Sequence, residues 1–335
     1  MLVRRAFHTW KPTRALRRSG LFRPFSSKSG VSDDERYLFD LNGFLVLRGV
    51  FNAEEVKQAN DSIDQHLEEV KERQEPALRN TRAKTPLSGD GVSGRKDLGG
   101  ALGWPGSQSQ IFRRMLADQR LVPYYHELLG VGYRLDHHPL IIIQDKGSEG
   151  FCMHGGTIDC SSGKYNQHLA YGCHNGQLTT SLLGVSLQLS DHNDGDGGFM
   201  IVRGSHKSNF RMPQGMIDGE LYDEHIYQPV TKAGDVVIFS EGTVHGAKAW
   251  NADHQRRIAL FRFAPCTMAY GRSYHEKWPA EFYEGMTAEQ AAVLEPPYST
   301  RLDRPIITEQ GEVEVQSRTD RKKKHDRQVF GTPYF

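Results

Sequence analysis

The chain lacks several features that would place it in a specialised class of proteins. Its 335 residues include only four cysteines, none in a CxxC pair, which is too few for a disulfide scaffold and does not suit a zinc site. No apolar run approaches the ~20 residues of a membrane-spanning helix, so we expect no membrane span. The formal net charge of +1 argues against nucleic acid as a partner. GxGxxG and P-loop motifs are also absent.

Acidic residues are missing from the first 30 positions, which contain eight Lys or Arg residues. The remainder of the chain holds 34 basic and 41 acidic residues and is therefore net negative. An arginine-rich, serine-containing start without acids is typical of an organellar transit peptide. We predict that residues 1–30 are a mitochondrial presequence, cleaved near residues 26–31, that directs the protein to the matrix. A basic tail on a cytoplasmic protein is the alternative.

Helical patterns come first along the chain, and short strand-like runs follow. A helix is predicted after the N-cap Asn52, with apolar residues at steps of three and four as far as Val70, and a second helix over 111–129. The strand-like runs are short, apolar and bounded by turn residues: 135–145, 182–190, 198–203, 235–240 and 258–264. Helices followed by strands without intervening helices predict an α+β fold with an antiparallel sandwich or barrel.

Two further segments break the pattern of regular elements. Residues 72–108 are rich in Gly, Pro, Ser and charge, which is typical of a functional lid or a disordered connection. The end of the chain is charge-rich, with RKKK at 321–324, and is predicted to be a solvated surface segment. The sequence thus divides into the presequence, one globular domain over 31–300 and a charged tail over 301–335, with no repeat and no signal for an oligomeric state.

Two of the fifteen histidines stand out by their context. His154 opens the sequence HGG after a strand-like stretch, and His245 opens HGA after the strand-like GDVVIF. A histidine at a strand end beside glycines, which let a ligand approach closely, suits a metal ligand at the mouth of a jelly-roll. Arg256 follows on the next strand, where a guanidinium can bind a carboxylate bidentately. Its neighbour Arg257 is expected to face the opposite side.

Three segments carry a resemblance to a known family: LNGFLVLRGVFNAEEV, QLSDHNDGDGGFMIVRGSHK, and GDVVIFSEGTVHG followed by RRIALFRF. In these segments, which span roughly residues 37–265, the chain resembles the phytanoyl-CoA dioxygenase family of non-haem iron, 2-oxoglutarate-dependent oxygenases. The resemblance implies a double-stranded β-helix (jelly-roll) core with flanking helices and a catalytic domain over 31–300. It also implies Fe(II), 2-oxoglutarate as co-substrate and a small-molecule substrate. Carried over by position, His154 and His245 are iron ligands, and Arg256 binds the distal carboxylate of 2-oxoglutarate.

The family's HxD motif is broken, because Gly156 stands where the aspartate belongs. The chemistry requires two neutral imidazoles and one carboxylate that together leave three positions on Fe(II) free. Three hypotheses follow from the missing aspartate. A carboxylate from elsewhere substitutes for it; or the position is open and holds a halide, as in halogenases of this superfamily with Gly or Ala there; or the site is degraded and the jelly-roll only binds ligands.

Two carboxylates are candidates for the third ligand. Glu241 is the first, because in an extended strand it shares a face with His245. At a rise of ~3.3 Å per residue the two residues lie some 13 Å apart, so this assignment requires a bend near Gly242. Asp159, five residues after His154, is the second candidate.

Overall fold

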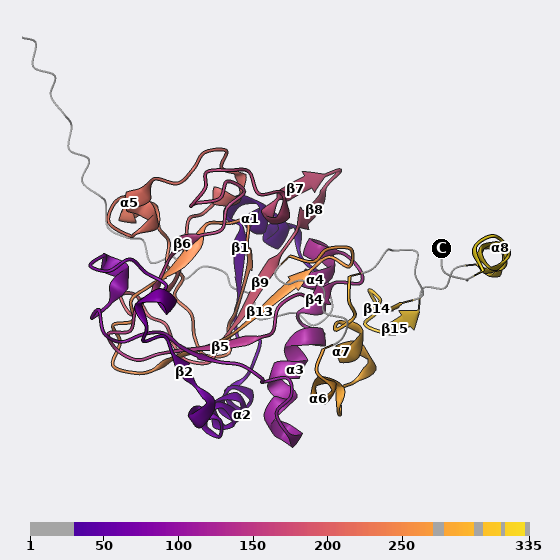
Figure 1. Ribbon diagram of the computed structural model, residues 1–335, viewed down its shortest axis with the longest axis horizontal. Helices are drawn as coiled ribbons and strands as arrows, with labels where there is room; N and C mark the ends of the chain where they lie inside the picture. The colour runs from indigo at the N-terminus through magenta and orange to yellow at the C-terminus, as the bar shows by residue number, and fades with distance from the viewer. Residues whose placement is uncertain (1–29, 271–277, 298–303, 316–318, 332–335) are drawn as a thin grey trace, which may run out of the picture.

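The computed structural model describes residues 30–270, 278–297, 304–315 and 319–331. The predicted presequence therefore lies outside the described residues, apart from Gly30. Two antiparallel β-sheets face each other, and helices cover the outer side of the larger sheet. Figure 1 shows α3 (Gln110–Ala117) and α4 (Val122–Leu129) on one side of the large sheet, and β6 (Phe151–His154) on the other.

The larger sheet holds eight strands, and its strand neighbours pair antiparallel. Its strands are β1 (Phe44–Leu47), β2 (Lys71–Glu72), β3 (Lys96–Leu98), β4 (Arg134–Leu135), β5 (Leu140–Gln144), β9 (Leu183–Gln188), β11 (Val236–Ser240) and β13 (Arg256–Ala264). Their order is β1-β11-β9-β13-β5-β3-β2, with β4 paired to β13. The predicted antiparallel α+β architecture is confirmed.

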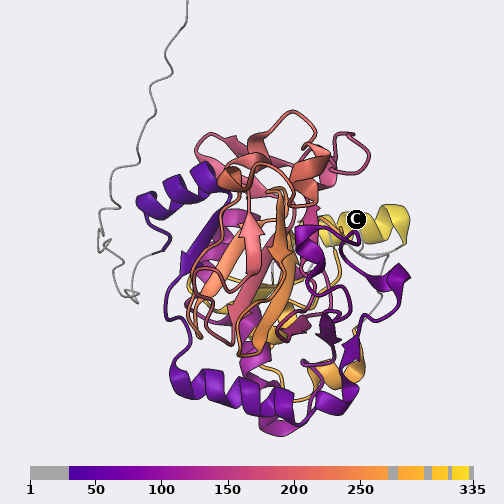
Figure 2. The same cartoon turned by 90° about the vertical axis from the view of Figure 1, so that its left-hand side faces the viewer.

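The smaller sheet has the order β10-β12-β6 and faces the viewer in Figure 2. The strands outside the larger sheet are β6, β10 (Gly198–Ile201) and β12 (His245–Lys248), and the hairpins β7 (Tyr171–His174)–β8 (Gln177–Thr180) and β14 (Pro305–Ile307)–β15 (Val313–Val315). The helices besides α3 and α4 are α1 (Asp33–Asn42), α2 (Ala53–Asp64), α5 (Gln214–Ile217), α6 (Ala280–Tyr283), α7 (Ala288–Ala292) and α8 (Asp320–Phe330). No helix in the described part of the chain is long and apolar enough to span a bilayer.

Side chains alternate along the central strands between two hydrophobic layers, as strand geometry requires. Ile238 of β11 and Phe261 of β13 join the main core, which packs against the helices. Their neighbours Phe239 and Leu260 point the other way and pack with Ile201 of the smaller sheet. The space between the sheets is therefore lined by Phe239, Leu260 and the residues that alternate with them, and the candidate site lies there.

The helix after Asn52 begins as predicted but ends at Asp64 rather than near Val70, because Leu67 lies in a separate 3-10 turn and is exposed. The single helix predicted over 111–129 is wrong. Asn52 Oδ1 accepts a hydrogen bond from Glu55 N at 2.9 Å, and Asn52 N donates in return to Glu55 Oε2 at 2.7 Å, which forms a capping box. In the second case α3 ends at Ala117 and α4 begins at Val122. Asp118 ends the first helix because its carboxylate accepts from the backbone N–H and guanidinium of Arg120 instead.

Residues 72–108 include a strand of the larger sheet, so the prediction of a disordered connection is wrong, whereas the prediction of a functional lid stays a prediction. Lys96–Leu98 form β3, which pairs with β5, and Leu98, Leu102 and Trp104 are buried in the main core. Two groups of this segment also donate hydrogen bonds to the buried Glu149 carboxylate: Thr81 Oγ1, at 2.9 Å, and the backbone N–H of Asn80. The segment is held by both backbone pairing and apolar burial.

Two other boundaries differ from the sequence-based expectation. The run 135–145 forms two strands, β4 and β5, rather than one. The core extends past residue 300, because Ile306 and Ile307 of β14 are buried and Ile307 packs in the main core. The basic helix α8 fits the predicted surface segment, since Asp326 is its only buried residue.

Candidate metal centre

His154 and His245 lie side by side at facing strand ends of the smaller sheet. His154 ends β6, His245 begins β12, and the two residues are cross-strand partners with ring centroids 4.3 Å apart. Both histidines therefore occupy the strand-end positions expected from the sequence. The pairing across two hydrogen-bonded strands brings together residues that are about ninety positions apart in the chain.

Backbone carbonyls fix the orientation of both imidazole rings. His154 Nδ1 donates to the carbonyl of Cys152 at 3.0 Å, and His245 Nδ1 donates to that of Thr243 at 2.8 Å. These bonds place the proton on each Nδ1 and leave each Nε2 with a free lone pair, as metal-binding histidines require. Burial, followed by the neighbouring imidazole, lowers the pKa of His154 to about 3, and burial also lowers the pKa of His245. Both rings are therefore neutral at physiological pH.

Glu241 reaches the histidines because the chain reverses between β11 and β12. Strand β11 ends at Ser240, and Thr243 N donates to Ser240 O at 2.8 Å to close a turn. A side chain at Gly242 would place its Cβ 2.4 Å from the Leu169 carbonyl oxygen, so glycine permits a close backbone approach here. The bend expected near Gly242 is present. The expectation that Glu241 and His245 share a face of an extended strand is wrong.

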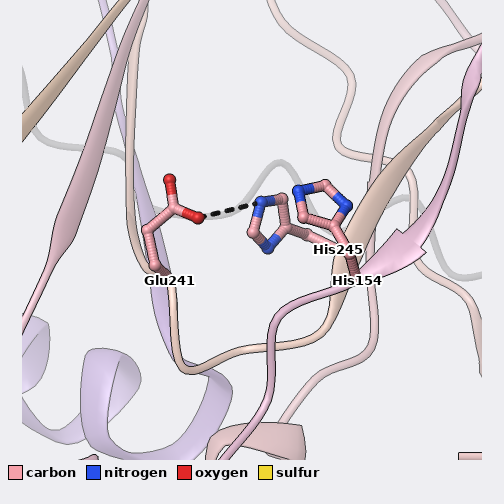
Figure 3. A group of neighbouring side chains, drawn as sticks. All are labelled: His154, Glu241 and His245. Carbon is pink, nitrogen blue, oxygen red and sulfur yellow. Dashed lines mark ion pairs between the residues drawn. The ribbon is translucent and has the colours of Figure 1, made fainter. Parts of the chain in front are cut away.

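The three side chains converge on one buried point, as Figure 3 shows. One ligand atom from each of His154, Glu241 and His245 lies within 4.8 Å of the other two, and Glu241 Oε2 is 3.5 Å from His245 Nε2. Burial acts to raise the pKa of Glu241, but the adjacent Arg262 and the two imidazoles outweigh it and bring the pKa to about 2. The site thus offers two neutral nitrogen ligands and one carboxylate, the donor set that suits non-haem Fe(II).

Asp159 does not join this group. It lies in its own turn, where Oδ1 accepts from Ser161 Oγ at 2.7 Å and from Ser162 N at 2.6 Å. These hydrogen bonds, with Ser162 first, lower the pKa of Asp159 to about 2. Among the described residues, His154, Glu241 and His245 form the one cluster with metal-ligand geometry. The structure therefore favours the first carboxylate candidate over the second.

The glycines that follow His154 pack directly against the Glu241 turn. Gly155 and Gly156 have φ angles of +82° and +86°, which L-residues with side chains rarely adopt. A Cβ at Gly155 would lie 2.6 Å from Glu241 O, and one at Gly156 would lie 2.9 Å from Val244 Cγ2. The position of the absent family aspartate is thus filled by close packing against the segment that carries Glu241.

Arg256 is a buried cation for which the described residues provide no carboxylate partner. It is 3% exposed, and its Nη1 donates to Gln144 Oε1 at 2.5 Å. Its Nε is buried with no hydrogen-bond partner among the described residues. Burial, and to a lesser extent Arg95, lower its pKa to about 9, so it stays protonated at neutral pH. Arg257 points away, as expected, and pairs with Asp64 on α2 at 2.7 Å.

Two arginines near the site were missed by the sequence analysis. Arg262 Nε donates to Glu241 Oε1 at 2.6 Å. Arg95, from the segment expected to be a lid, lies 5.4 Å from the centroid of the Phe151 ring, which is itself 4.5 Å from the His154 ring. Alternation along β13 was a usable signal for Arg262, because residues 256 and 262 share a face. No local signal marked Arg95.

Similarity to solved structures establishes the fold. HygX from Streptomyces hygroscopicus, with nickel and 2-oxoglutarate bound, matches with a TM-score of 0.56 at 22% identity, over 72% of this chain and 90% of that one. Apo HygX from the same organism gives 0.57 at 20% identity, over 76% and 94%. The α-ketoglutarate-dependent carbocyclase SnoK from nogalamycin biosynthesis gives 0.52 at 15% identity, over 85% and 100%. The shared architecture is the double-stranded β-helix with flanking helices.

Similarity in sequence establishes the family. No curated protein sequence matches the chain. The phytanoyl-CoA dioxygenase (PhyH) family model, however, matches residues 39–258, which is more than half of the chain and includes both histidines, Glu241 and Arg256. The chain therefore belongs to the phytanoyl-CoA dioxygenase family of Fe(II)- and 2-oxoglutarate-dependent oxygenases.

Proposed function

We propose that the protein hydroxylates a small organic substrate, with His154, His245 and Glu241 as the iron ligands and Arg256 as the partner of 2-oxoglutarate. The observation that carries this proposal is the convergence of two neutral imidazoles and one ionised carboxylate on a single buried point. This donor set is the face on which non-haem Fe(II) oxygenases leave three positions for co-substrate and oxygen. When bound, Fe(II) supplies the oxygen chemistry that couples decarboxylation of 2-oxoglutarate to oxidation of a substrate C–H bond.

Arg256 fits the co-substrate because its own environment lacks an anion. A buried guanidinium with an unused Nε is costly by itself, and a carboxylate can supply both the missing charge and the missing acceptor. Arg256 lies on the inner face of β13, which borders the space between the sheets where the histidines also lie. We assign it to the carboxylate of 2-oxoglutarate remote from the metal.

Backbone carbonyls orient the two imidazoles, and aromatic rings pack beside them. The carbonyls of Cys152 and Thr243 hold the imidazoles so that each Nε2 faces the metal position. The rings of Phe151 and Phe239 pack at 4.5 Å from the His154 ring and 4.7 Å from the His245 ring, respectively. These apolar neighbours lower the local polarity and so strengthen the electrostatic interactions within the site.

The halogenase-type and the binding-protein hypotheses both started from a missing carboxylate. Glu241 now lies beside both histidines, ionised and buried, which removes that starting point. The unpaired Arg256 argues further against a degraded site, because a protein that no longer used 2-oxoglutarate would gain stability by replacing this residue. We therefore retain the oxygenase proposal alone.

Loss of any one metal ligand should abolish metal binding and turnover. We expect His154→Ala, His245→Ala and Glu241→Gln each to lower Co(II) or Fe(II) affinity by more than about 100-fold, beyond the loss typical for outer partners of a ligand. Each should also abolish succinate formation from 2-oxoglutarate. Anaerobic metal titration and succinate assays measure both effects. The exposed His168→Ala serves as the matched control, and near-normal turnover in any of the three variants would remove that residue from the ligand set.

Restoring the family's aspartate should not improve the site. Gly156→Asp places a side chain at φ +86° and against Val244, so we expect a lower melting temperature and no gain in metal affinity. Gly195→Ala is the matched control, because Gly195 has the same φ but open space around its Cβ position. Gly156→Ala should destabilise the protein more than Gly195→Ala. Tighter Fe(II) binding in Gly156→Asp would instead support the open-site hypothesis.

Replacing Arg256 should affect co-substrate binding and stability in opposite directions. Arg256→Met should raise the KM for 2-oxoglutarate on the order of 100-fold, because loss of one partner of a buried charged pair costs about 2–5 kcal/mol. Without 2-oxoglutarate the same variant should melt at a higher temperature, since an unpaired buried charge has been removed. Arg257→Met, on the outer face of β13, is the control for both measurements. Equal effects of the two variants on KM would show that Arg256 does not bind the co-substrate.

We also propose import into the mitochondrial matrix, on the strength of the acid-free, arginine-rich composition of residues 1–30. A fluorescent reporter fused to residues 1–40 should localise to mitochondria and be cleaved near residues 26–31. Replacing the arginines among these residues by glutamine should abolish import, because the positive charge is what the pattern supplies. A cytosolic distribution of the unmodified fusion would refute the proposal.

A further inference from the structure

The Glu241 carboxylate uses its two oxygens on opposite sides. Oε1 accepts a hydrogen bond from Arg262 Nε at 2.6 Å, and Oε2 lies 3.5 Å from His245 Nε2. Glu241 is almost fully buried, whereas the Arg262 side chain is 22% exposed. Arg262 thus contacts one carboxylate oxygen, and the other oxygen is the one that lies beside the histidines.

Within the described part of the chain, Arg262 is the hydrogen-bond donor that fixes this carboxylate. The backbone of Glu241 is held, since its N–H donates to Leu182 O at 3.0 Å, but the side chain has several rotatable bonds beyond that anchor. A carboxylate without a second partner is free to turn and to offer a metal both oxygens. Binding through both oxygens would occupy one of the three positions that 2-oxoglutarate and oxygen need.

Arg262 and Arg256 lie on the same strand, β13. Arg262 lies six residues after Arg256, so alternation places both arginines on the inner face of the strand. In the part of the chain that the structure describes, Arg256 has no anionic partner, whereas Arg262 is paired with Glu241. The two arginines thus differ in what they are available to bind.

We propose that Arg262 is a positioning residue that holds Glu241 as a one-oxygen metal ligand. This inference rests on the proposed function, because it takes Glu241 as the third iron ligand. By retaining Oε1, Arg262 directs Oε2 towards the metal and keeps the remaining positions free. Glu241 lies on a turn and not at position 156, two residues after His154. On that turn, the hydrogen bond from Arg262 is what restricts rotation of its carboxylate.

The test compares Arg262→Gln, Arg262→Lys and Glu241→Gln with the control Arg257→Gln, on the same strand but the opposite face. The readouts are the Co(II) dissociation constant, the visible absorption spectrum of the Co(II) protein, which reports coordination geometry, and the melting temperature without metal. We expect Arg262→Gln to weaken Co(II) binding by about 10–100-fold and to change the spectrum. Arg262→Lys should restore most of the affinity, because a single ammonium donor can replace the single Nε bond. Arg257→Gln should match the unmodified protein.

A double-mutant cycle separates positioning from a general structural effect. In the Glu241→Gln background, Arg262→Gln should cause no further loss of Co(II) affinity, because the residue acts through Glu241. Additive losses of Co(II) affinity in the double variant would overturn the proposal. Unchanged Co(II) affinity and spectrum in Arg262→Gln, together with weak Co(II) binding in Glu241→Gln, would also overturn it. That last outcome would leave the iron-ligand assignment intact. If Glu241→Gln also kept its Co(II) affinity, the proposed ligand set itself would fail.

If Arg262→Gln does not fold, Arg262→Lys provides the test. Retained Co(II) affinity in Arg262→Lys supports the proposal, and a loss as large as that of Glu241→Gln overturns it.

Discussion

The turn between β11 and β12 is the constraint on which the candidate site depends. It carries the chain from the larger sheet to the smaller one and sets Glu241 and His245 at one point. Distant parts of the chain fasten it, since Thr243 Oγ1 donates to Gly43 O at 3.1 Å and Val244 N donates to Ser205 Oγ at 2.7 Å. The carboxylate therefore comes from a backbone that is already ordered, so little reorganisation is needed to receive a metal.

The same turn explains why glycines follow His154. The loop after β6 presses on the Glu241–Val244 segment so closely that side chains at Gly155 and Gly156 would clash with it. At Gly155 a Cβ would meet the backbone of the turn, and at Gly156 it would meet a methyl group of Val244 and require a positive φ. In the proposed site the carboxylate comes instead from the connection between β11 and β12. What the metal requires is the set of ligand atoms, and their origin in the chain is free to vary.

Local sequence patterns correctly predicted the features that depend on local backbone geometry. Alternation on β13 gave the inward Arg256 and the outward Arg257, and glycines beside strand ends marked the two histidines. The same alternation applied to Arg262, but nothing in the sequence shows that its partner would be Glu241. That pairing requires the bend at Gly242, whose backbone lies close to the Leu169 carbonyl, more than seventy residues earlier. An isolated strand would have kept Glu241 and His245 some 13 Å apart, so local patterns alone do not predict that Glu241 lies beside the histidines.

The inner face of β13 carries two arginines, Arg256 and Arg262, whose charges are compensated in different ways. Arg262 finds its anion within the protein, so its charge is compensated whether or not a ligand is present. Among the described residues, Arg256 donates to the neutral amide oxygen of Gln144 and has no anionic partner, and a buried guanidinium in that state destabilises the fold. Such a position is tolerated when the missing acceptor arrives with a ligand that binds only the folded state, because binding then returns the lost stability through mass action. The pairing state of each arginine therefore supports their different proposed roles, Arg262 as the partner of Glu241 and Arg256 as the partner of 2-oxoglutarate.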